Sequence, residues 1–482
     1  MNYRTVFHTV GNILVIEGMI MIIPALIALG FGEQNALTGF LAAILLAFFA
    51  GFLLTRIDRK QEIPLVRDSM VIVALSWISI SLFGSVPYYV SREIPVFVEA
   101  FFETMSGFTT TGITVFKDLE AVSKSLLFWR SFTVWLGGMG VLAFMLAVFP
   151  RKSGGSAVNL MRAESSGPQN DKIVPRTQKS AVILYLIYAG LSVLDYIFLR
   201  AGGMNQFDAV LTMFGTAGTG GFNIHDQSIA YYNSDYITIV TTVFMFLFGV
   251  SYSLFYLILT GRVLSAFRNA ELKTYVMVTV GASLAIAVDL TAKYGNFLRA
   301  LINSSFAVTA MSSSTGYIQE NYDAWPGFSR TLLLFLMFFG ACSGSTACGI
   351  KLSRIIILAK SVWADVKRLL SPHSVNIISY NGKPLREETI SGVHSFLAMY
   401  FAVFIVSVVL VSIDDLDMIT NLSAVAAAIN NVGCGFSLVG PIGSFSVFSR
   451  FSMIVLSFDM LAGRLEIFPM LMLFYPRTWS RY

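Results

Sequence analysis

The chain has 482 residues, of which 55% are hydrophobic and only 13% are charged. Soluble domains carry about 25% charged residues, so this composition excludes an ordinary soluble protein and indicates several membrane-spanning segments. The net charge of +5 is small, and without a long basic run we expect no nucleic-acid partner. The three cysteines and four histidines show neither a disulfide framework nor the spacing of a metal site.

Ten apolar stretches are long enough to cross a bilayer, which takes about 20 residues of helix. No small-residue cleavage site follows the first stretch, so we expect a retained helix and not a secretory signal. The expected spans are, in chain order, residues 10–29, 37–54, 70–90, 126–149, 180–199, 236–260, 274–292, 328–358, 393–413 and 449–474.

Four shorter apolar segments lie between the members of consecutive pairs of spans. Each has about 12 residues, too few to cross the membrane and too apolar for an ordinary loop, so we expect re-entrant half-helices. These segments are 95–108, 205–217, 298–311 and 417–429.

The order long, short, long recurs four times after the first two spans, and such recurrence indicates a repeated structural unit. We therefore expect an all-α integral membrane protein with ten transmembrane helices and four re-entrant pore half-helices. It is built as four pseudo-symmetric helix–pore loop–helix repeats that follow an extra helix pair at 1–57. The repeats are expected at 68–150, 178–264, 272–368 (with a broken second helix) and 390–482.

Each short segment ends in a patch rich in glycine and small polar residues, at the same point of its repeat. The patches lie at 109–114, 218–222, 313–317 and 430–435. Irregular backbone at membrane depth is tolerated only against protein or water, and its carbonyl oxygens can replace the hydration shell of a cation. The patches contain no Asp or Glu, which suits a monovalent cation better than Ca²⁺. One patch alone would indicate a turn, but four at equivalent points predict an ion filter.

The distribution of lysine and arginine predicts the orientation in the membrane. If the N-terminus is cytoplasmic, 23 of the 33 basic residues lie on the inner side, nine lie outside, and Arg464 lies within the membrane. Both termini are then expected in the cytoplasm, and the four patches face outward. Carboxylates in the outer segments would favour cations near the outer mouth.

Five stretches of the chain resemble the Trk/Ktr/HKT superfamily of potassium transporters, and its Trk branch in particular. They are EAFFETMSGFTTTGIT at 99–114, WLGGMG at 135–140, TGGF at 219–222, GACSGSTACGIK at 340–351 and LAGRLEIF at 461–468. The initial helix pair is also similar to the extra pair of that branch. The resemblance implies four linked units around one pore, and potassium uptake across a bacterial inner membrane.

The resemblance also implies which residues form the filter. In this superfamily a glycine at the first position goes with potassium selectivity and a serine with sodium transport, and this chain has Gly112. The fourth loop departs most from the others, with Asn431 and Val432 in place of hydroxyl residues. The implied filter residues are Thr111, Gly112, Thr219, Gly220, Thr315, Gly316, Val432 and Gly433.

A gating loop beneath the filter is implied in the third repeat, although Ala347 and Cys348 stand where relatives usually have glycine. Arg464 lies in the last span, where a charge is costly and usually faces the protein interior or a water-filled cavity. The resemblance implies a place near the pore below the filter, where a fixed positive charge raises the barrier for cations. The alternative for Arg464 is a buried ion pair with Glu466 or Asp459. The implied gating residues are Gly340, Ser343, Gly344, Ser345, Thr346, Gly349 and Lys351.

Glu103, in the first half-helix, is a candidate to cap the loop backbone. The glycines Gly137, Gly138 and Gly140 lie inside an apolar span, where close helix packing explains them.

The implied metal is K⁺ alone, as the transported ion at the filter, with no covalently bound cofactor. By resemblance the protein is a homodimer in the lipid bilayer that sits on a cytosolic ring of TrkA-like, NAD- or ATP-binding regulatory subunits. The basic inner segment 351–368 is the expected docking surface.

Several alternatives stay open at this point. A Na⁺, Na⁺/K⁺ or H⁺-coupled transporter of the same fold is the main one, and the sequence does not distinguish a channel from a symporter. An intramembrane enzyme is disfavoured because the chain has no HExxH, GxSxG or paired intramembrane Asp motif. A receptor without transport would explain the helices but not four glycine-rich loops.

Overall fold

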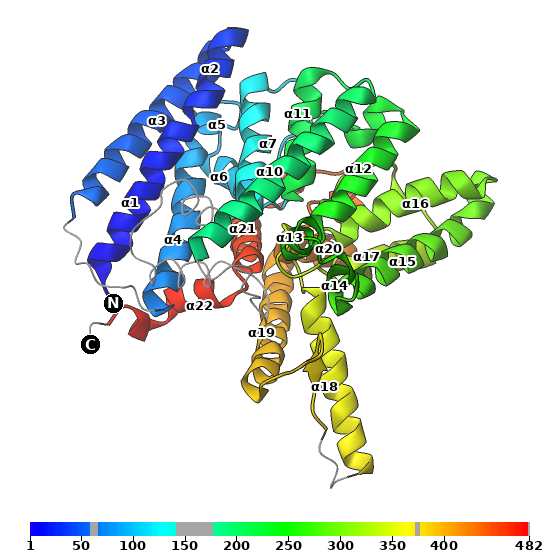
Figure 1. Cartoon of the computed structure of the whole chain (residues 1–482). Helices are drawn as coiled ribbons and strands as arrows, with labels where there is room; N and C mark the ends of the chain where they lie inside the picture. Colours follow the sequence, from blue (N-terminus) through cyan, green and yellow to red (C-terminus); the bar gives the residue numbers. More distant parts are fainter. Residues whose placement is uncertain (58–65, 141–176, 372–375, 481–482) are drawn as a thin grey trace.

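The computed structural model describes residues 1–57, 66–140, 177–371 and 376–480 (Figure 1). The predicted span at 126–149 and the end of the predicted first repeat extend beyond the described residues. Within the described part the chain is mostly helical, and its two short strands form one hairpin.

The first helices form a long antiparallel pair. Helices α1 (Tyr3–Ile20) and α2 (Ile22–Phe31) together pass the length and hydropathy test for one membrane span, and α3 (Gln34–Thr55) runs back beside α1. The contact between α1 and α3 depends on two glycines. A β-carbon on Gly11 would lie 2.9 Å from the carbonyl oxygen of Gly51, and one on Gly51 would lie 2.9 Å from that of Gly11. Small residues at such a crossing allow the two backbones to approach closely.

The elements of the four predicted repeats follow in chain order, and each repeat is named below by its place in that order. The elements of the first two are α4 (Val66–Gly84), α5 (Val86–Val90), α6 (Phe97–Phe108) and α7 (Lys124–Gly138), then α10 (Thr177–Ala201), α11 (Gln206–Gly218), η1 (Ser228–Tyr232), α12 (Asp235–Phe248), α13 (Tyr252–Leu259) and α14 (Val263–Phe267). The third repeat contains α15 (Ala270–Tyr294), α16 (Phe297–Ser312), η2 (Tyr322–Ala324), α17 (Gly327–Leu336) and α18 (Leu352–Leu370).

A hairpin of β1 (Ser379–Tyr380) and β2 (Lys383–Pro384) connects the third repeat to the fourth. The fourth repeat contains α19 (Glu387–Val411), η3 (Ser412–Asp414), α20 (Met418–Asn430), η4 (Ser437–Val439), η5 (Phe445–Val447), α21 (Arg450–Arg464), α22 (Phe468–Phe474) and η6 (Pro476–Thr478). Figure 1 shows that α18 projects from one end of the bundle, with the hairpin beside it.

The half-helices α6, α11, α16 and α20 match the four short apolar segments. Three of them begin at a side-chain cap, because Asn205, Asn296 and Asp417 accept hydrogen bonds from backbone N–H groups of the first turn. Such caps satisfy donors that a helix end otherwise leaves unpaired. All residues of α20 from Ala424 to Asn430 are buried. The short helices therefore lie in the interior of the bundle.

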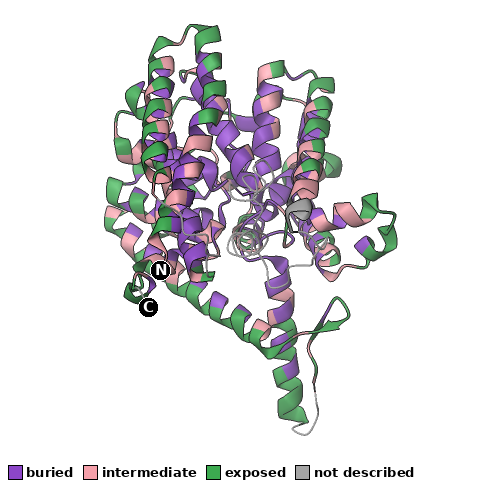
Figure 2. Cartoon of the chain, turned by 60° about the vertical axis from the view of Figure 1, so that its left-hand side comes forward, coloured by how far each residue is buried: buried purple, intermediate pink, exposed green. Residues whose placement is uncertain are grey.

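Outer helices expose apolar surface. On α3, Leu45 is 70% and Phe49 is 65% exposed. Figure 2 shows buried residues concentrated in the centre of the bundle, with exposed residues on the outer helices and the projecting segment. An exposed apolar face around a buried interior fits a hydrocarbon environment.

The prediction of an all-α membrane protein is confirmed in its general form. Among the described residues, six helical segments are long and apolar enough to span a membrane, and α12 with α13 is a seventh if the bent pair counts as one. The count of ten stays a prediction, because α17 and α21, which lie in the predicted spans 328–358 and 449–474, are only 10 and 15 residues long.

The predicted span at 236–260 is not straight. Helices α12 and α13 meet at 92°. The break lies at Gly249, whose carbonyl oxygen accepts a hydrogen bond from the backbone N–H of Cys342 in the third repeat. A long-range partner therefore replaces the intrahelical hydrogen bond, which apolar length alone could not predict.

We expect Gly51→Val to lower the stability of the detergent-solubilised protein by about 1–3 kcal/mol, the usual cost of overpacking. The added side chain would press on Val15 and Gly11. Gly30→Ala is the matched control, since Gly30 is exposed and has no atom within 4 Å of the added carbon. Melting followed by size-exclusion chromatography would test this, and equal melting temperatures for the two variants would contradict the packing argument.

Candidate ion pathway

Each half-helix ends in the same hydrogen-bonded turn. A residue in left-handed conformation follows the helix, and a glycine with positive φ comes two positions later. Between them, one residue donates its N–H to a carbonyl five residues earlier. These bonds are Thr111 to Ser106 at 2.8 Å, Gly220 to Gly215 at 3.1 Å, Thr315 to Ala310 at 2.9 Å and Val432 to Ala427 at 2.9 Å. The four turns are thus equivalent by backbone conformation as well as by position.

This pattern fixes the register of the second loop. Thr219, with φ of 54°, occupies the left-handed position that Thr110 occupies in the first loop. The glycine equivalent to Gly112 is therefore Gly221, with φ of 50°, and Gly220 takes the place of Thr111. From the sequence alone, Thr219 and Gly220 are expected to be equivalent to Thr111 and Gly112, because each pair is a threonine followed by a glycine. The signal that could have indicated the correct register was Gly221, the second of two consecutive glycines, since glycine tolerates positive φ best.

The four loops close a ring. A β-carbon built on the positive-φ glycine of each loop would lie 2.5 Å or less from a carbonyl oxygen of the next loop. The pairs are Gly112 with Gly220, Gly221 with Thr315, Gly316 with Val432, and Gly433 with Thr111. We call these eight residues the loop ring. No residue with a side chain fits the glycine positions, and the carbonyl oxygens are held at the contacts between neighbouring loops.

The electrostatics of the loop ring favour a cation. Each half-helix ends directly before its loop, at Phe108, Gly218, Ser312 and Asn430. The carboxyl end of a helix carries about half a negative elementary charge, so four such ends converge on the ring. The side chains of Thr111, Thr315 and Val432 are fully buried.

Side chains brace the loops in two different ways. In the first loop the hydroxyls of Thr109 and Thr111 are 2.8 Å apart, and in the third loop Ser313 and Thr315 form the same pair at 2.7 Å. The fourth loop lacks this pair. There Asn431 donates from Nδ2 to the Thr111 hydroxyl at 2.7 Å and to the Met460 carbonyl at 2.9 Å. The unusual fourth loop is thus tied directly to the first.

A buried ion pair lies behind the first two loops. Arg130 Nε is 2.6 Å from Glu103 Oε1, and both side chains are almost completely buried. Glu103 also accepts hydrogen bonds from the Val115 N–H at 2.9 Å and the Thr114 hydroxyl at 3.1 Å, so its predicted capping of the loop backbone is confirmed.

Arg130 reaches from this pair to the second loop. It donates to the Asn223 carbonyl at 2.7 Å, and its guanidinium lies 3.8 Å from the ring centre of Phe222. Sequence reasoning missed Arg130. The available signal was a single arginine within the apolar helix α7, where an unpaired charge would be costly.

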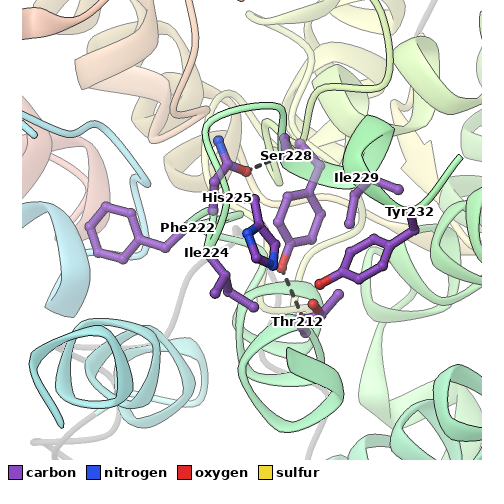
Figure 3. Close-up of a pocket in the computed structure, with 9 residues that line it drawn as sticks. Thr212, Phe222, Ile224, His225, Ser228, Ile229 and Tyr232 are labelled. Atoms are coloured by element: carbon purple, nitrogen blue, oxygen red, sulfur yellow. Dashed lines mark hydrogen bonds between the residues drawn. The ribbon is translucent and has the colours of Figure 1, made fainter. Parts of the chain in front are cut away.

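A small pocket lined by Thr212, Ser228 and Tyr317, among other residues, flanks the second and third loops (Figure 3). His225 Nε2 lies 3.2 Å from Asp208, which also accepts a hydrogen bond from the Tyr232 hydroxyl at 3.0 Å. Tyr317, directly after Gly316, donates to the Thr212 carbonyl at 2.9 Å. Among the described residues no group of three acidic, histidine or cysteine side chains could hold a metal ion. The hydrogen bond from Tyr317 to Thr212 therefore links the third loop to α11 beside this pocket.

The third repeat is interrupted between α17 and α18. In the third-repeat loop, residues 340–351, the N–H of Gly340 donates to the Ile350 carbonyl at 2.6 Å, so the two ends of the loop meet. Gly344 and Gly349 adopt φ of 74° and 76°. The loop also contacts the second repeat, because the Tyr252 N–H donates to the Gly344 carbonyl at 3.0 Å.

The other predicted gating residues lie in the same third-repeat loop. The part of this loop around Cys348 lies next to the loop ring. Cys348 donates its N–H to the Ser314 hydroxyl at 2.9 Å. Further contacts join Ser345 Oγ to the Cys342 carbonyl at 2.7 Å, Thr346 Oγ1 to the Phe248 carbonyl at 3.2 Å, and Lys351 Nζ to the Ala347 carbonyl.

Arg464 lies between the first loop and the third-repeat loop. Its Nη1 donates to the Thr110 hydroxyl at 3.2 Å, the Thr346 carbonyl at 3.0 Å and the Cys348 sulfur at 3.0 Å. Its Nη2 donates to the carbonyls of Gly137 and Gly138. The guanidinium therefore joins three elements that surround the space next to the loop ring.

The alternative expectation, an ion pair of Arg464 with Glu466 or Asp459, is wrong. Glu466 forms its ion pair with Arg354, and Asp459 accepts a hydrogen bond from Ser407 at 2.7 Å. Residue spacing suggested these pairs, but the turn after α21 places Glu466 at positive φ and away from Arg464.

The glycines of α7 act in two ways. A β-carbon on Gly138 would lie 2.8 Å from Gly218 and from the Tyr188 hydroxyl, so the expected close packing of helices is confirmed. The same residues offer their carbonyls to Arg464.

Outside the membrane segments, Asp417 caps α20 at the end away from the ring. A hydrogen bond from the Thr420 side chain holds the pKa of Asp417 below its usual value. The carboxylate therefore stays charged at neutral pH and adds negative potential on this side of the bundle.

Comparison with known proteins gives a consistent result. A family model described as TrkH, cation transport protein, matches residues 33–481. The Trk system potassium uptake protein TrkH of Escherichia coli (strain K12) is 33% identical over 485 residues, covering 99% of this chain and 100% of that protein. TrkG of the same strain is 29% identical, covering 99% and 98%. The crystal structure of the potassium transporter TrkH from Vibrio parahaemolyticus matches with a TM-score of 0.88 at 30% identity, over 100% of both chains.

We expect Arg130→Gln to destabilise the protein by about 3–5 kcal/mol, because it leaves the Glu103 carboxylate buried without its partner. Arg450→Gln is the matched control, since Arg450 is exposed at the start of α21. The yield of monodisperse protein and its melting temperature in detergent would measure the difference. A stable Arg130→Gln variant would show that the ion pair does not support the loops.

Proposed function

The chain belongs to the TrkH family of cation transport proteins, and from this premise we propose that it takes up K⁺ through a filter formed by the loop ring. It is a multi-pass membrane component of a Trk potassium uptake system, with K⁺ as the transported ion, and it is not an enzyme. The observation that carries the proposed filter is the closed ring of four equivalent loops. A ring of backbone carbonyls can replace the water around a large monovalent cation.

The proposed filter comprises the eight residues of the loop ring, together with Thr219, which directly precedes Gly220. Gly221 joins the residues expected from sequence, since it has the conformation of the other three glycines. Two features support selection of K⁺. The ligands are neutral oxygens, and their positions are fixed by contacts between loops that leave no room for a side chain. Gly112 at the first position is the residue that the resemblance links with potassium.

The proposed gate is the third-repeat loop together with Arg464. The loop is hydrogen-bonded to Ser314, directly before the third filter pair. Arg464 bridges the loop to Thr110, so its positive charge lies where a cation leaving the filter would pass. A fixed charge of the same sign opposes the ion until the loop and the guanidinium move.

The wider arrangement follows the same proposal. Ten spans result if α7, the pair α17–α18 and the pair α21–α22 are added to the six apolar segments and the bent pair α12–α13. With this number both termini lie in the cytoplasm, and the membrane is the inner membrane. Helix α18 carries Lys360, Lys367 and Arg368 on a projecting, largely exposed segment. This basic helix supports docking of a cytosolic, nucleotide-binding regulatory ring onto a homodimer of the chain.

Uptake of ⁸⁶Rb⁺ into proteoliposomes tests the filter. For the wild type we expect competition by K⁺ and Rb⁺ but not by Na⁺ or Li⁺, and we expect Gly112→Ser to relax this selectivity, because an added side chain would collide with the Gly220 carbonyl. Gly281→Ala is the matched control, since nothing lies within 4 Å of the added carbon.

Equal competition by Na⁺ in the wild type would support a broader Na⁺/K⁺ transporter of the same fold. Uptake that depends on an imposed proton gradient would support H⁺ coupling. No uptake with the cytosolic partner present would contradict transport itself.

Neutralising Arg464 tests the gate. We expect Arg464→Gln to raise ⁸⁶Rb⁺ uptake roughly tenfold, which corresponds to a barrier lowered by about 1.4 kcal/mol. Arg464→Lys should stay close to the wild type because it keeps the charge. Uptake that is unchanged by Arg464→Gln, in a folded protein, would remove Arg464 from the proposed gate.

A further inference from the structure

Glu271 is a buried carboxylate that neither the proposed filter nor Arg464 uses. It is the second residue of α15 and is 5% exposed. Its Oε1 accepts hydrogen bonds from the Ser343 N–H at 2.8 Å, the Ser343 hydroxyl at 2.9 Å and the Ser353 N–H at 3.0 Å. One carboxylate oxygen thus accepts all three hydrogen bonds, and hydrogen bonds to a carboxylate are stronger than those between neutral groups.

These donors come from the two ends of the third-repeat loop. Ser343 lies in the first part of the loop, and Ser353 lies in the first turn of α18, two residues after the loop ends and ten after Ser343. The hydroxyls of the two serines are also 2.6 Å apart. Glu271 therefore joins the beginning and the end of the loop at one point of α15. A movement that opens the loop has to break these hydrogen bonds.

The other carboxylate oxygen connects Glu271 to the β-hairpin. The Tyr380 hydroxyl donates to Oε2 at 3.3 Å, and the Asn381 side chain accepts from the Ala270 N–H at 2.9 Å. The hairpin thus contacts the first two residues of α15. Lys360 of α18 also donates to the Ser379 carbonyl at 2.8 Å.

The hairpin tip is on the basic side of the bundle. Asn381, Gly382 and Lys383 are exposed, whereas Tyr380 is buried against α18 and α19. The positive-inside rule assigns this side to the cytoplasm. Figure 1 shows the hairpin next to the projecting helix α18.

We propose that Glu271 is a latch for the gate, in the sense that its carboxylate holds the beginning and the end of the third-repeat loop together in the closed state. The hydrogen bond from Tyr380 to Glu271 makes this closure depend on the position of the hairpin. Glu271 is a positioning residue, since it acts on the loop and not on the ion. The proposal rests on the proposed function, because it takes the third-repeat loop as the gate. Displacement of the hairpin from the cytoplasmic side would weaken the latch.

Cys348 provides a test that needs no ion flux. The chain has three cysteines, all buried, so Cys342→Ser with Cys434→Ser leaves Cys348 as the single thiol, within the latched loop. The rate at which a charged methanethiosulfonate modifies Cys348 would be measured in inside-out vesicles. The variants compared are Glu271→Ala, Glu271→Gln and Tyr380→Phe. Glu388→Gln is the control, since Glu388 is an exposed carboxylate in the first turn of α19.

We expect Glu271→Ala to raise the labelling rate roughly tenfold or more, since the closed loop loses three charge-assisted hydrogen bonds. Glu271→Gln and Tyr380→Phe should give smaller increases, and Glu388→Gln none. Melting temperatures would identify any variant that is unfolded. If Glu271→Ala is unfolded, the labelling rates of Glu271→Gln and Tyr380→Phe test the proposal. Unchanged labelling in folded Glu271 variants would overturn the latch.

Uptake of ⁸⁶Rb⁺ by the same Glu271 variants, with the native cysteines, separates this proposal from the proposed function. Faster uptake at unchanged Rb⁺/Na⁺ selectivity supports both. Faster labelling without faster uptake supports the latch and rejects the third-repeat loop as the gate. If the wild type fails to transport even with its partner, the proposed function fails while the labelling result still decides the latch.

Discussion

Backbone polar groups inside a membrane must find partners within the protein, and this constraint explains how the centre of the molecule is built. The four loops leave the helical conformation there, and each donates backbone N–H groups to its own half-helix and places a glycine against a carbonyl of the next loop. The ring closes only if all four loops are present. Caps at the outer ends of the half-helices and the Glu103–Arg130 pair behind the ring serve to hold this arrangement.

Buried charges near the ring differ in the kind of partner they have. Arg130 is paired with a carboxylate and is almost fully buried, which suits a permanent brace. Arg464 contacts carbonyls, a hydroxyl and a thiol, and no acidic side chain of the described residues lies within ion-pair distance of it. Its partners belong to three separate elements, so their relative movement would release it. This contrast distinguishes the proposed filter, which Arg130 braces, from the proposed gate, which contains Arg464.

The sequence predicts well what depends on local apolar length. The short segments at 205–217 and 298–311 correspond to α11 (Gln206–Gly218) and α16 (Phe297–Ser312), because the length of an apolar run and its capping residue are encoded locally. The sequence predicts poorly the features that depend on contacts with residues far along the chain. The register of the second loop, the bend at Gly249 and the role of Arg130 are set by contacts with residues far along the chain. A single charge in an apolar helix indicates that a partner exists, but not which one.

The most direct test of the account is to locate bound Rb⁺ by its anomalous scattering in crystals of the wild-type protein grown with Rb⁺ and again with excess Na⁺. The account predicts a peak on the axis of the loop ring, next to the carbonyl oxygens of Thr111, Gly220, Thr315 and Val432, that persists in Na⁺. Anomalous density that is absent from the ring, or that Na⁺ displaces, would contradict a K⁺-selective filter at these loops.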